Sequence, residues 1–166
     1  MILEGRKPYL SEVEKVQNPA LGAMLIWKYC RSYQSGMTSD SSPLLVAFLV
    51  LPLCWHRPTL NILKSTRVQS GLGKFCEKLS EKREELIAVH ERVLELREPT
   101  LASIGFGERH ELISIDYGKG YMRALDLKEP KLPERVRDQA KAAEKLGVWF
   151  AALKPVEIFH ALRVEA

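Results

Sequence analysis

The most hydrophobic run of the sequence, residues 43–55, limits the possible folds more than any other feature. It reads PLLVAFLVLPLCW and contains no charged residue. A membrane-spanning helix needs about 20 apolar residues, whereas this run stops after Asp40 on one side and before His56 on the other, and it contains Pro52. We therefore interpret it as the central buried helix of a water-soluble protein. Because it is apolar all round, we expect other helices to surround it.

Length and composition indicate one compact domain. A chain of 166 residues with 46% hydrophobic residues can bury a continuous core without disulfides or metals. We expect a single domain over residues 1–166, with short polar or proline-bearing linkers near residues 36–42 and 128–133. The formal net charge of +4 is compatible with a polyanionic partner but does not require one.

The three cysteines indicate a reducing compartment. Cys30, Cys54 and Cys76 are odd in number, widely spaced and set in apolar stretches, where a thiol behaves as a small hydrophobic group. Residues 1–7 also lack the apolar segment of a signal peptide. We expect buried free thiols and a cytoplasmic protein.

Helical patterns account for most of the chain. Asn18 followed by Pro19 is a typical helix start, and the pattern that follows ends near Gly36. Apolar residues then recur at three-and-four spacing over residues 71–98, opposite a face that is almost wholly charged and that we interpret as solvated more readily than as a docking face. Further helices are predicted over residues 58–64, 101–106 (after Pro99, with Thr100 as its cap), 134–153 and 155–163.

Residues 111–125 predict the one β-hairpin. Two short segments, 111–116 and 120–125, are rich in β-branched or aromatic residues and are separated by the turn 117–119. The fold class is therefore mainly α with one hairpin, and the order of a short helix before a hairpin is that of a winged helix-turn-helix. As a wing, the hairpin would contact DNA phosphates through Lys119 and Arg123, helped by Lys64 and Arg67. The alternative is a hairpin that only covers the core.

The C-terminal part is too apolar to be a loose tail. It carries Trp149, Phe150, Ile158, Phe159 and Leu162. These residues form either a lid on the core or a surface that docks a partner subunit.

Motifs for catalysis or cofactor binding are missing from the sequence. It contains no GxGxxG after a strand, no phosphate-binding GxxxxGK[ST], no HExxH, no CxxC and no GxSxG. The histidines at 56, 90, 110 and 160 are scattered without metal-ligand spacing. We therefore predict a protein that is not an enzyme and has no catalytic residues, no cofactor and no metal.

Several long segments resemble a known family. They are NPALGAMLIWKYCRSY (18–33), LLVAFLVLPLCWH (44–56), SGL (70–72), ERVLELREPTLASIGFG (91–107), KLGVWFAAL (145–153) and EIFHALRV (157–164). Together they look like the middle component of bacterial three-component ABC systems, which include Lamassu-type operons. The resemblance implies a small subunit that couples an SMC-like ABC ATPase to a nuclease or other effector, in defence against phage or plasmid DNA, with DNA reached through the complex. It implies no catalytic residues.

A free-standing winged-helix DNA-binding regulator is the alternative function. Such a regulator presents a recognition helix with several Arg, Lys, Asn or Gln residues near its start. The segment before the hairpin, residues 101–106, reads LASIGF and offers none of these. This difference favours the bridging subunit.

Overall fold

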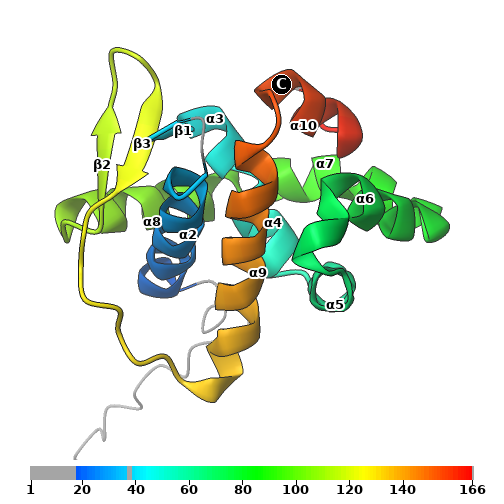
Figure 1. Cartoon of the computed structure of the whole chain (residues 1–166), viewed down its shortest axis with the longest axis horizontal. Helices are drawn as coiled ribbons and strands as arrows, with labels where there is room; N and C mark the ends of the chain where they lie inside the picture. The colour runs from blue at the N-terminus through cyan, green and yellow to red at the C-terminus, as the bar shows by residue number, and fades with distance from the viewer. Residues whose placement is uncertain (1–17, 37–38, 166) are drawn as a thin grey trace, which may run out of the picture.

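Helix α2, Pro19–Gln34, is the central element of the structure, a computed structural model that describes residues 18–36 and 39–165. The predicted start is confirmed: the Asn18 side chain accepts a hydrogen bond from the Ala20 N–H at 2.8 Å, and Pro19 occupies the first turn. Helices α8 (Arg97–Arg109) and α9 (Glu134–Ala151) both pack against α2 (Figure 1). The core of the molecule is therefore built around one amino-terminal helix.

Most of the apolar run is buried as predicted, although Leu45 is 56% exposed, and the run is not a single helix. It divides into β1 (Ser42–Pro43), α3 (Leu44–Ala47) and α4 (Val50–Cys54). At the break between α3 and α4, the Phe48 N–H donates to the Leu45 carbonyl and the Leu49 N–H to the Val46 carbonyl. These bonds span three residues, as in a 3₁₀ turn, and not four as in an α-helix. Pro52 cannot donate to the carbonyl four residues before it, so a regular helix through this point would lack a hydrogen bond.

No helix in the described part of the chain is by itself long and apolar enough to cross a membrane. Two segments, Leu44–Cys54 and Arg57–Ser65, pass such a test only as a pair, and they are bent by 99° relative to each other.

The predicted amphipathic helix over residues 71–98 is also divided. Helix α5 (Arg57–Ser65) and the 3₁₀ turn η1 (Val68–Ser70) lead into α6 (Gly71–Glu81), and α7 (Arg83–Glu95) follows after a break at Lys82. The long helix was predicted to be kinked or broken at Pro99, and a break is present three residues earlier, at Leu96, between α7 and α8 (Arg97–Arg109). The prediction that Thr100 caps the following helix was wrong. Pro99 lies in the first turn of α8. Backbone N–H groups in a first turn have no acceptor within the helix, so a proline, which has no N–H, is tolerated there. Thr100 is buried inside that helix.

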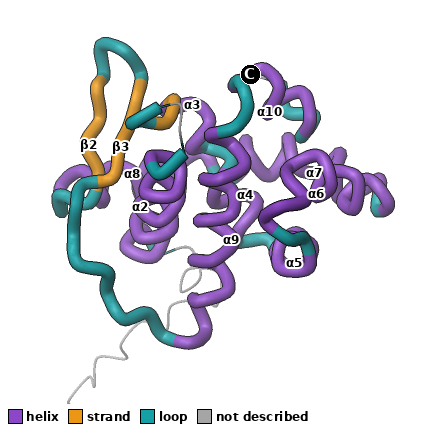
Figure 2. Tube along the Cα trace, viewed as in Figure 1, coloured by secondary structure: helices purple, strands orange, loops and turns teal. Residues whose placement is uncertain are grey.

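The predicted hairpin is confirmed, and it belongs to a three-stranded sheet (Figure 2). Strands β2 (Ile113–Asp116) and β3 (Tyr121–Ala124) pair antiparallel, with Ile113 opposite Ala124. Strand β1, which the sequence did not reveal, pairs with the other edge of β3 through Ser42 opposite Met122. A helix, a short strand, further helices and a hairpin, with the first strand beside the last, resemble the order of a winged helix.

A linker without helix or strand joins the hairpin to α9, and it is tied to α2. The Trp27 indole N–H donates to the Leu125 carbonyl at 3.0 Å. Lys28, which is buried, forms ion pairs with Glu129 of the linker and with Glu144 of α9. After α9, the short helix α10 (Pro155–Ala161) packs against α3 and α6.

Candidate interaction surfaces

The hairpin projects from one end of the molecule and carries two of the predicted DNA-contacting residues. Lys119 in the turn and Arg123 on β3 are both exposed. The tip is anchored to neighbouring acids: the Asp116 carboxylate accepts from the Lys119 backbone N–H at 3.1 Å, and the Tyr117 hydroxyl donates to Glu108 at 2.6 Å. The hairpin thus has the position of a wing, and its turn is held by the side chains of Asp116 and Glu108.

The structure does not bring Lys64 and Arg67 to the hairpin. Both lie at the end of α5, on the other side of α2 and α9 from the hairpin (Figure 1). Lys64 is paired with Asp138 of α9 at 2.8 Å, and this hydrogen bond lowers the pKa of the Asp138 carboxyl. The four predicted DNA-contacting residues therefore form two separate pairs, not one surface.

The five apolar residues predicted at the C-terminal part lie in the core. Trp149, Phe150, Ile158, Phe159 and Leu162 are all buried. The Trp149 indole N–H donates to the Val68 carbonyl at 2.8 Å, and the rings of Phe150 and Tyr29 meet edge to face with their centroids 5.9 Å apart. In this fold these residues pack as a lid on the core, and none has an exposed fraction above 8%.

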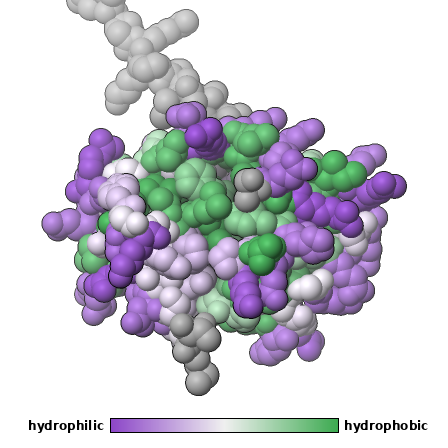
Figure 3. Space-filling view, turned by 90° about the horizontal axis from the view of Figure 1, so that it is seen from above, coloured by the Kyte–Doolittle hydropathy of each residue, from purple (hydrophilic) through white to green (hydrophobic). Residues whose placement is uncertain are grey.

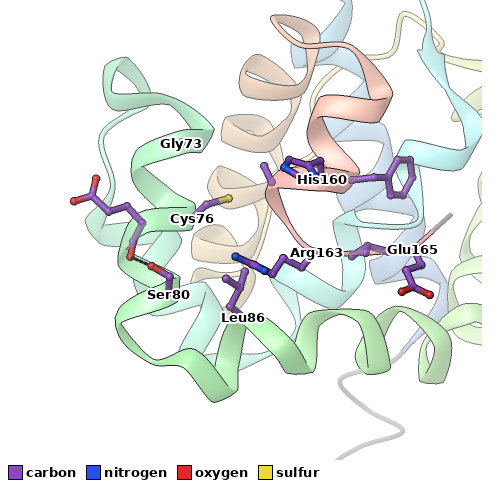
Figure 4. A pocket seen from close by; sticks show the side chains of 11 residues that line it. Gly73, Cys76, Ser80, Leu86, His160, Arg163 and Glu165 are labelled. Atoms are coloured by element: carbon purple, nitrogen blue, oxygen red, sulfur yellow. Dashed lines mark hydrogen bonds between the residues drawn. The ribbon is translucent and has the colours of Figure 1, made fainter.

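A recess with a volume of about 570 Å³ lies between α6, the start of α7 and the C-terminal segment (Figure 4). Cys76 comes from α6, and Arg163 reaches across from the C-terminal segment toward Leu86. Arg163 has a φ of 53°, and the Val164 N–H donates to the Phe159 carbonyl at 3.0 Å. This is a Schellman ending of α10, with arginine at the position that usually holds glycine.

The groups of the recess that could act as nucleophiles are held within the fold or protonated. Burial raises the pKa of the Cys76 thiol to about 12, so it is protonated at neutral pH and a weak nucleophile. The Ser80 hydroxyl donates to the Glu77 carbonyl within its own helix, and His90 Nδ1 accepts from the Glu165 N–H at 3.3 Å. Within residues 18–36 and 39–165, no group of three His, Cys, Asp or Glu side chains is placed to hold a metal.

Helix α7 is fixed to the body of the protein by a partly buried polar network. Arg92 donates to the Thr59 hydroxyl of α5 at 3.1 Å and pairs with Glu85 at 3.5 Å. His56, at the start of α5, lies 2.9 Å from the same hydroxyl. Burial, and then the charge of Arg92, lower the pKa of His56, so its ring is neutral at neutral pH.

The outer face of α7 and α8 is less polar than the sequence suggested. The face over residues 71–98 was interpreted as almost wholly charged, yet Ile87 and Leu94 have exposed fractions of 55% and 59%, and Leu101 of α8 has one of 43%. Val93, which precedes Leu94, is the one packed against the core. The seven-residue spacing of the three exposed residues is a signal that the sequence analysis overlooked.

Comparison with models of protein families gives a match over nearly the whole chain. The sequence model of a protein family described as ABC-three component (ABC-3C) system Middle Component 3 matches residues 7–166. The matched range includes all the described helices and strands. Neither a curated protein nor a solved structure matches.

Proposed function

Because the chain belongs to the Middle Component 3 family of ABC-three component systems, we propose that it is a non-catalytic subunit that bridges an SMC-like ABC ATPase and a nuclease-like effector. The family resemblance that the sequence predicted is confirmed by the match over residues 7–166. The bridge acts in the cytoplasm, in defence against phage or plasmid DNA.

The observation that carries the proposal is the extent of the family match. It covers the central helix, the hairpin and the C-terminal lid together, so the whole described fold corresponds to the family's unit. A middle component works with the other components of its system, and a protein of this kind needs surfaces for them. Three exposed apolar residues on α7 and α8 are available for such a contact.

The chemistry of the side chains supports a role without catalysis. Catalytic nucleophiles need a lowered pKa or a neighbouring base, whereas burial raises the pKa values of Cys30, Cys54 and Cys76. These cysteines are also free thiols, which supports the proposed cytoplasmic location because disulfides are rare there.

A free-standing winged-helix DNA-binding regulator is supported by the order of helices and strands alone. In such a protein, the helix before the hairpin reads bases in the major groove. That helix is α8, and among its exposed residues only Arg97 and Arg109 carry the donors that base reading uses. The exposed residues between them are Glu98, Leu101, Ala102, Gly105 and Glu108, which suit base reading poorly. Any DNA contact through Lys119 and Arg123 would be made to phosphates, and such contacts position the protein on the duplex without recognising the base sequence.

Co-expression with the ATPase and the effector encoded nearby tests the proposal. Affinity purification through a tag on this chain should recover both proteins at modest salt. If both partners are expressed in folded form and neither co-elutes, while this chain runs alone as a monomer or homodimer, the bridging function is wrong.

A further inference from the structure

One carboxylate in the linker between the hairpin and α9, residues 125–133, pairs with two cations of α2. One oxygen of Glu129 contacts the Lys28 ammonium group, and its other oxygen lies 3.7 Å from the Arg31 guanidinium group. Lys28 also pairs with Glu144 of α9 at 3.2 Å. The Lys28 side chain is 5% exposed, whereas the Glu129 side chain is 56% exposed. A buried cation is thus matched by a carboxylate in solvent, on a segment without helix or strand.

The burial of Lys28 is not explained by stability alone. Removal of an ammonium group from water is costly, and the attraction of its partners offsets this cost only in part. An apolar side chain of similar length would fill the same place, and such a replacement of a buried ion pair is often neutral or stabilising. A cation in this place can instead bind an anionic ligand.

A recess with a volume of about 330 Å³ lies between the linker, α2 and α9. The charged side chains that line it are three cations and two carboxylates: Lys28, Arg137, Lys141, Glu129 and Glu144. Arg137 donates through Nε to the Leu132 carbonyl at 3.3 Å, and neither Arg137 nor Lys141 forms an ion pair with a described residue. A second recess, of about 240 Å³, shares Lys28 and the two glutamates and adds Arg31.

The two recesses together have an excess of positive charge. The cations that line them are Lys28, Arg31, Arg137 and Lys141, against two glutamates. Asp138 also acts on Lys141 through its charge, but its carboxylate is paired with Lys64 at 2.8 Å. When Glu129 moves away, the four cations face Glu144 alone. A phosphate group has more charge and more acceptor oxygens than a carboxylate, and both Lys and Arg bind it.

The linker and the start of α9 lie at the opposite end of the molecule from α3, α10 and the tip of the hairpin (Figure 1). The end with α3 and α10, seen from above, shows apolar side chains in its middle with hydrophilic ones around them (Figure 3). The recess beside the linker is lined mostly by charged side chains. It is therefore distinct from the hairpin tip, where Lys119 lies.

We propose that Lys28, Arg31, Arg137 and Lys141 form a phosphate-binding site, and that the Glu129 carboxylate competes with the ligand for this site. A bound phosphate group displaces Glu129 from Lys28 and releases the linker from α2, while Glu144 stays paired with Lys28. The phosphate group belongs to a free nucleotide or to a nucleic-acid backbone, which share this chemistry. The inference does not depend on the proposed function.

Binding of sodium pyrophosphate, measured by calorimetry at fixed ionic strength, tests the competition. Glu129→Gln keeps the shape of the side chain and removes its charge, so it should raise the affinity by about tenfold, the effect of one charged hydrogen bond. Glu134→Gln is the matched control, because Glu134 is exposed at the start of α9 and does not line either recess. Its affinity should equal that of the wild type. Thermal unfolding should show that both variants are folded.

The two unpaired cations of α9 provide the reverse test. In the Glu129→Gln background, Arg137→Gln with Lys141→Gln should reduce the affinity for pyrophosphate by at least about tenfold. Lys131→Gln with Arg135→Gln removes the same charge from exposed positions nearby that do not line the recesses, so it should have little effect. In the wild type, the heteronuclear NOE of the backbone amides of Lys128 and Glu129 should fall when pyrophosphate binds, since the linker is released.

Competition identifies the source of the phosphate group. If ATP displaces pyrophosphate, the ligand is a nucleotide; if only a short DNA duplex does so, with the same dependence on Arg137 and Lys141, the ligand is a nucleic-acid backbone. The proposal is overturned if neither competes, if millimolar pyrophosphate binds neither the wild type nor Glu129→Gln, or if Glu129→Gln leaves the affinity unchanged. Equal losses for the two cation pairs, or a linker that stays rigid in the complex, would also overturn it.

Discussion

Single glycines decide how closely the central helices approach. A Cβ atom at Gly147 of α9 would overlap the Tyr29 carbonyl of α2 and would lie 2.9 Å from the Tyr33 backbone nitrogen. At Gly22 of α2, a Cβ atom would overlap the Ser103 side chain of α8. The two helix pairs that build the core thus depend on residues without side chains, because a methyl group at either position meets tightly packed atoms.

Gly147→Ala should destabilise the protein by about 1–3 kcal/mol, since its new methyl group meets backbone that cannot rotate away. Gly105→Ala is the opposite case, because Gly105 lies in α8 with nothing within 4 Å of its Cβ position. That substitution should stabilise by about 0.5–1 kcal/mol through helix propensity. Urea unfolding of both variants measures the contrast, and equal effects of the two substitutions would contradict the close packing of α2 and α9.

A second prediction for a single residue follows from the positive φ of Arg163. A left-handed conformation costs a residue with a Cβ about 1–2 kcal/mol, and glycine avoids this cost but is more flexible when unfolded. Arg163→Gly should therefore raise the free energy of unfolding by about 0.5–1 kcal/mol. Arg163→Ala keeps the strain and serves as the control. An equal gain for both variants in urea unfolding would show that removal of the arginine side chain, not relief of strain, is responsible.

For helices and strands, the sequence predicted where helices form and which faces are buried better than it predicted where a helix is interrupted. Asn18, the apolar spacing of α6, α7 and α9, and the hairpin turn were visible because each depends on neighbours in the sequence. The division of the apolar run and the pairing of β1 with β3 were not, because Ser42 and Met122 are far apart in the chain. The Schellman endings at Glu111 and Arg163 were hidden because neither residue is glycine.

The candidate site was less predictable than the fold. Hydrophobicity alone cannot separate a core residue from a docking residue, and this is why Trp149 and Phe159 were open to both interpretations although both are buried. Lys64 and Arg67 were grouped with the hairpin by charge, but their distance from it depends on the packing of α5. Spacing also does not decide which of the neighbours Val93 and Leu94 faces the core: Val93 packs against it, whereas Leu94 is exposed.

One lysine holds the end of α5 against α9. Lys145 donates to the carbonyls of Leu63 and Thr66, each at 2.7 Å, and burial lowers its pKa from the ordinary value. Lys145→Met keeps most of the side-chain length but leaves both carbonyls without this donor, so it should cost about 1–3 kcal/mol. Hydrogen exchange should become faster around residues 63–68. Lys141→Met, at an exposed position of the same helix, should change neither quantity; if both substitutions act alike, the Lys145 contacts do not stabilise α5.

For the whole molecule, the buried cysteines predict a loss of stability at alkaline pH. Burial raises the pKa values of Cys30 and Cys54, and that of Cys76 to about 12, above the ordinary thiol value of 9.0. Above this value the unfolded chain releases the thiol protons and the folded chain keeps them. Each thiol therefore lowers the free energy of unfolding by up to about 1.4 kcal/mol per pH unit. Lys145, whose pKa is lowered, acts in the opposite direction below 10.5, whereas Tyr29 and Tyr33, whose pKa values burial raises, act in the same direction as the thiols above 10.0.

Urea unfolding between pH 8 and pH 10.5 should show this decrease. In the Cys76→Ala variant, which lacks one of the three thiols, the decrease should be less steep. A stability that stays constant or rises over this range would contradict the burial of the thiols as the structure describes it.

The central claim is that this chain joins the other two components, and reconstitution with and without it is the most direct test. The ATPase and the effector are purified separately, mixed, and analysed by size-exclusion chromatography with and without this chain. We predict that the ATPase and the effector elute together only when the chain is present. Co-elution of the ATPase and the effector in the absence of this chain would contradict its role as a bridge.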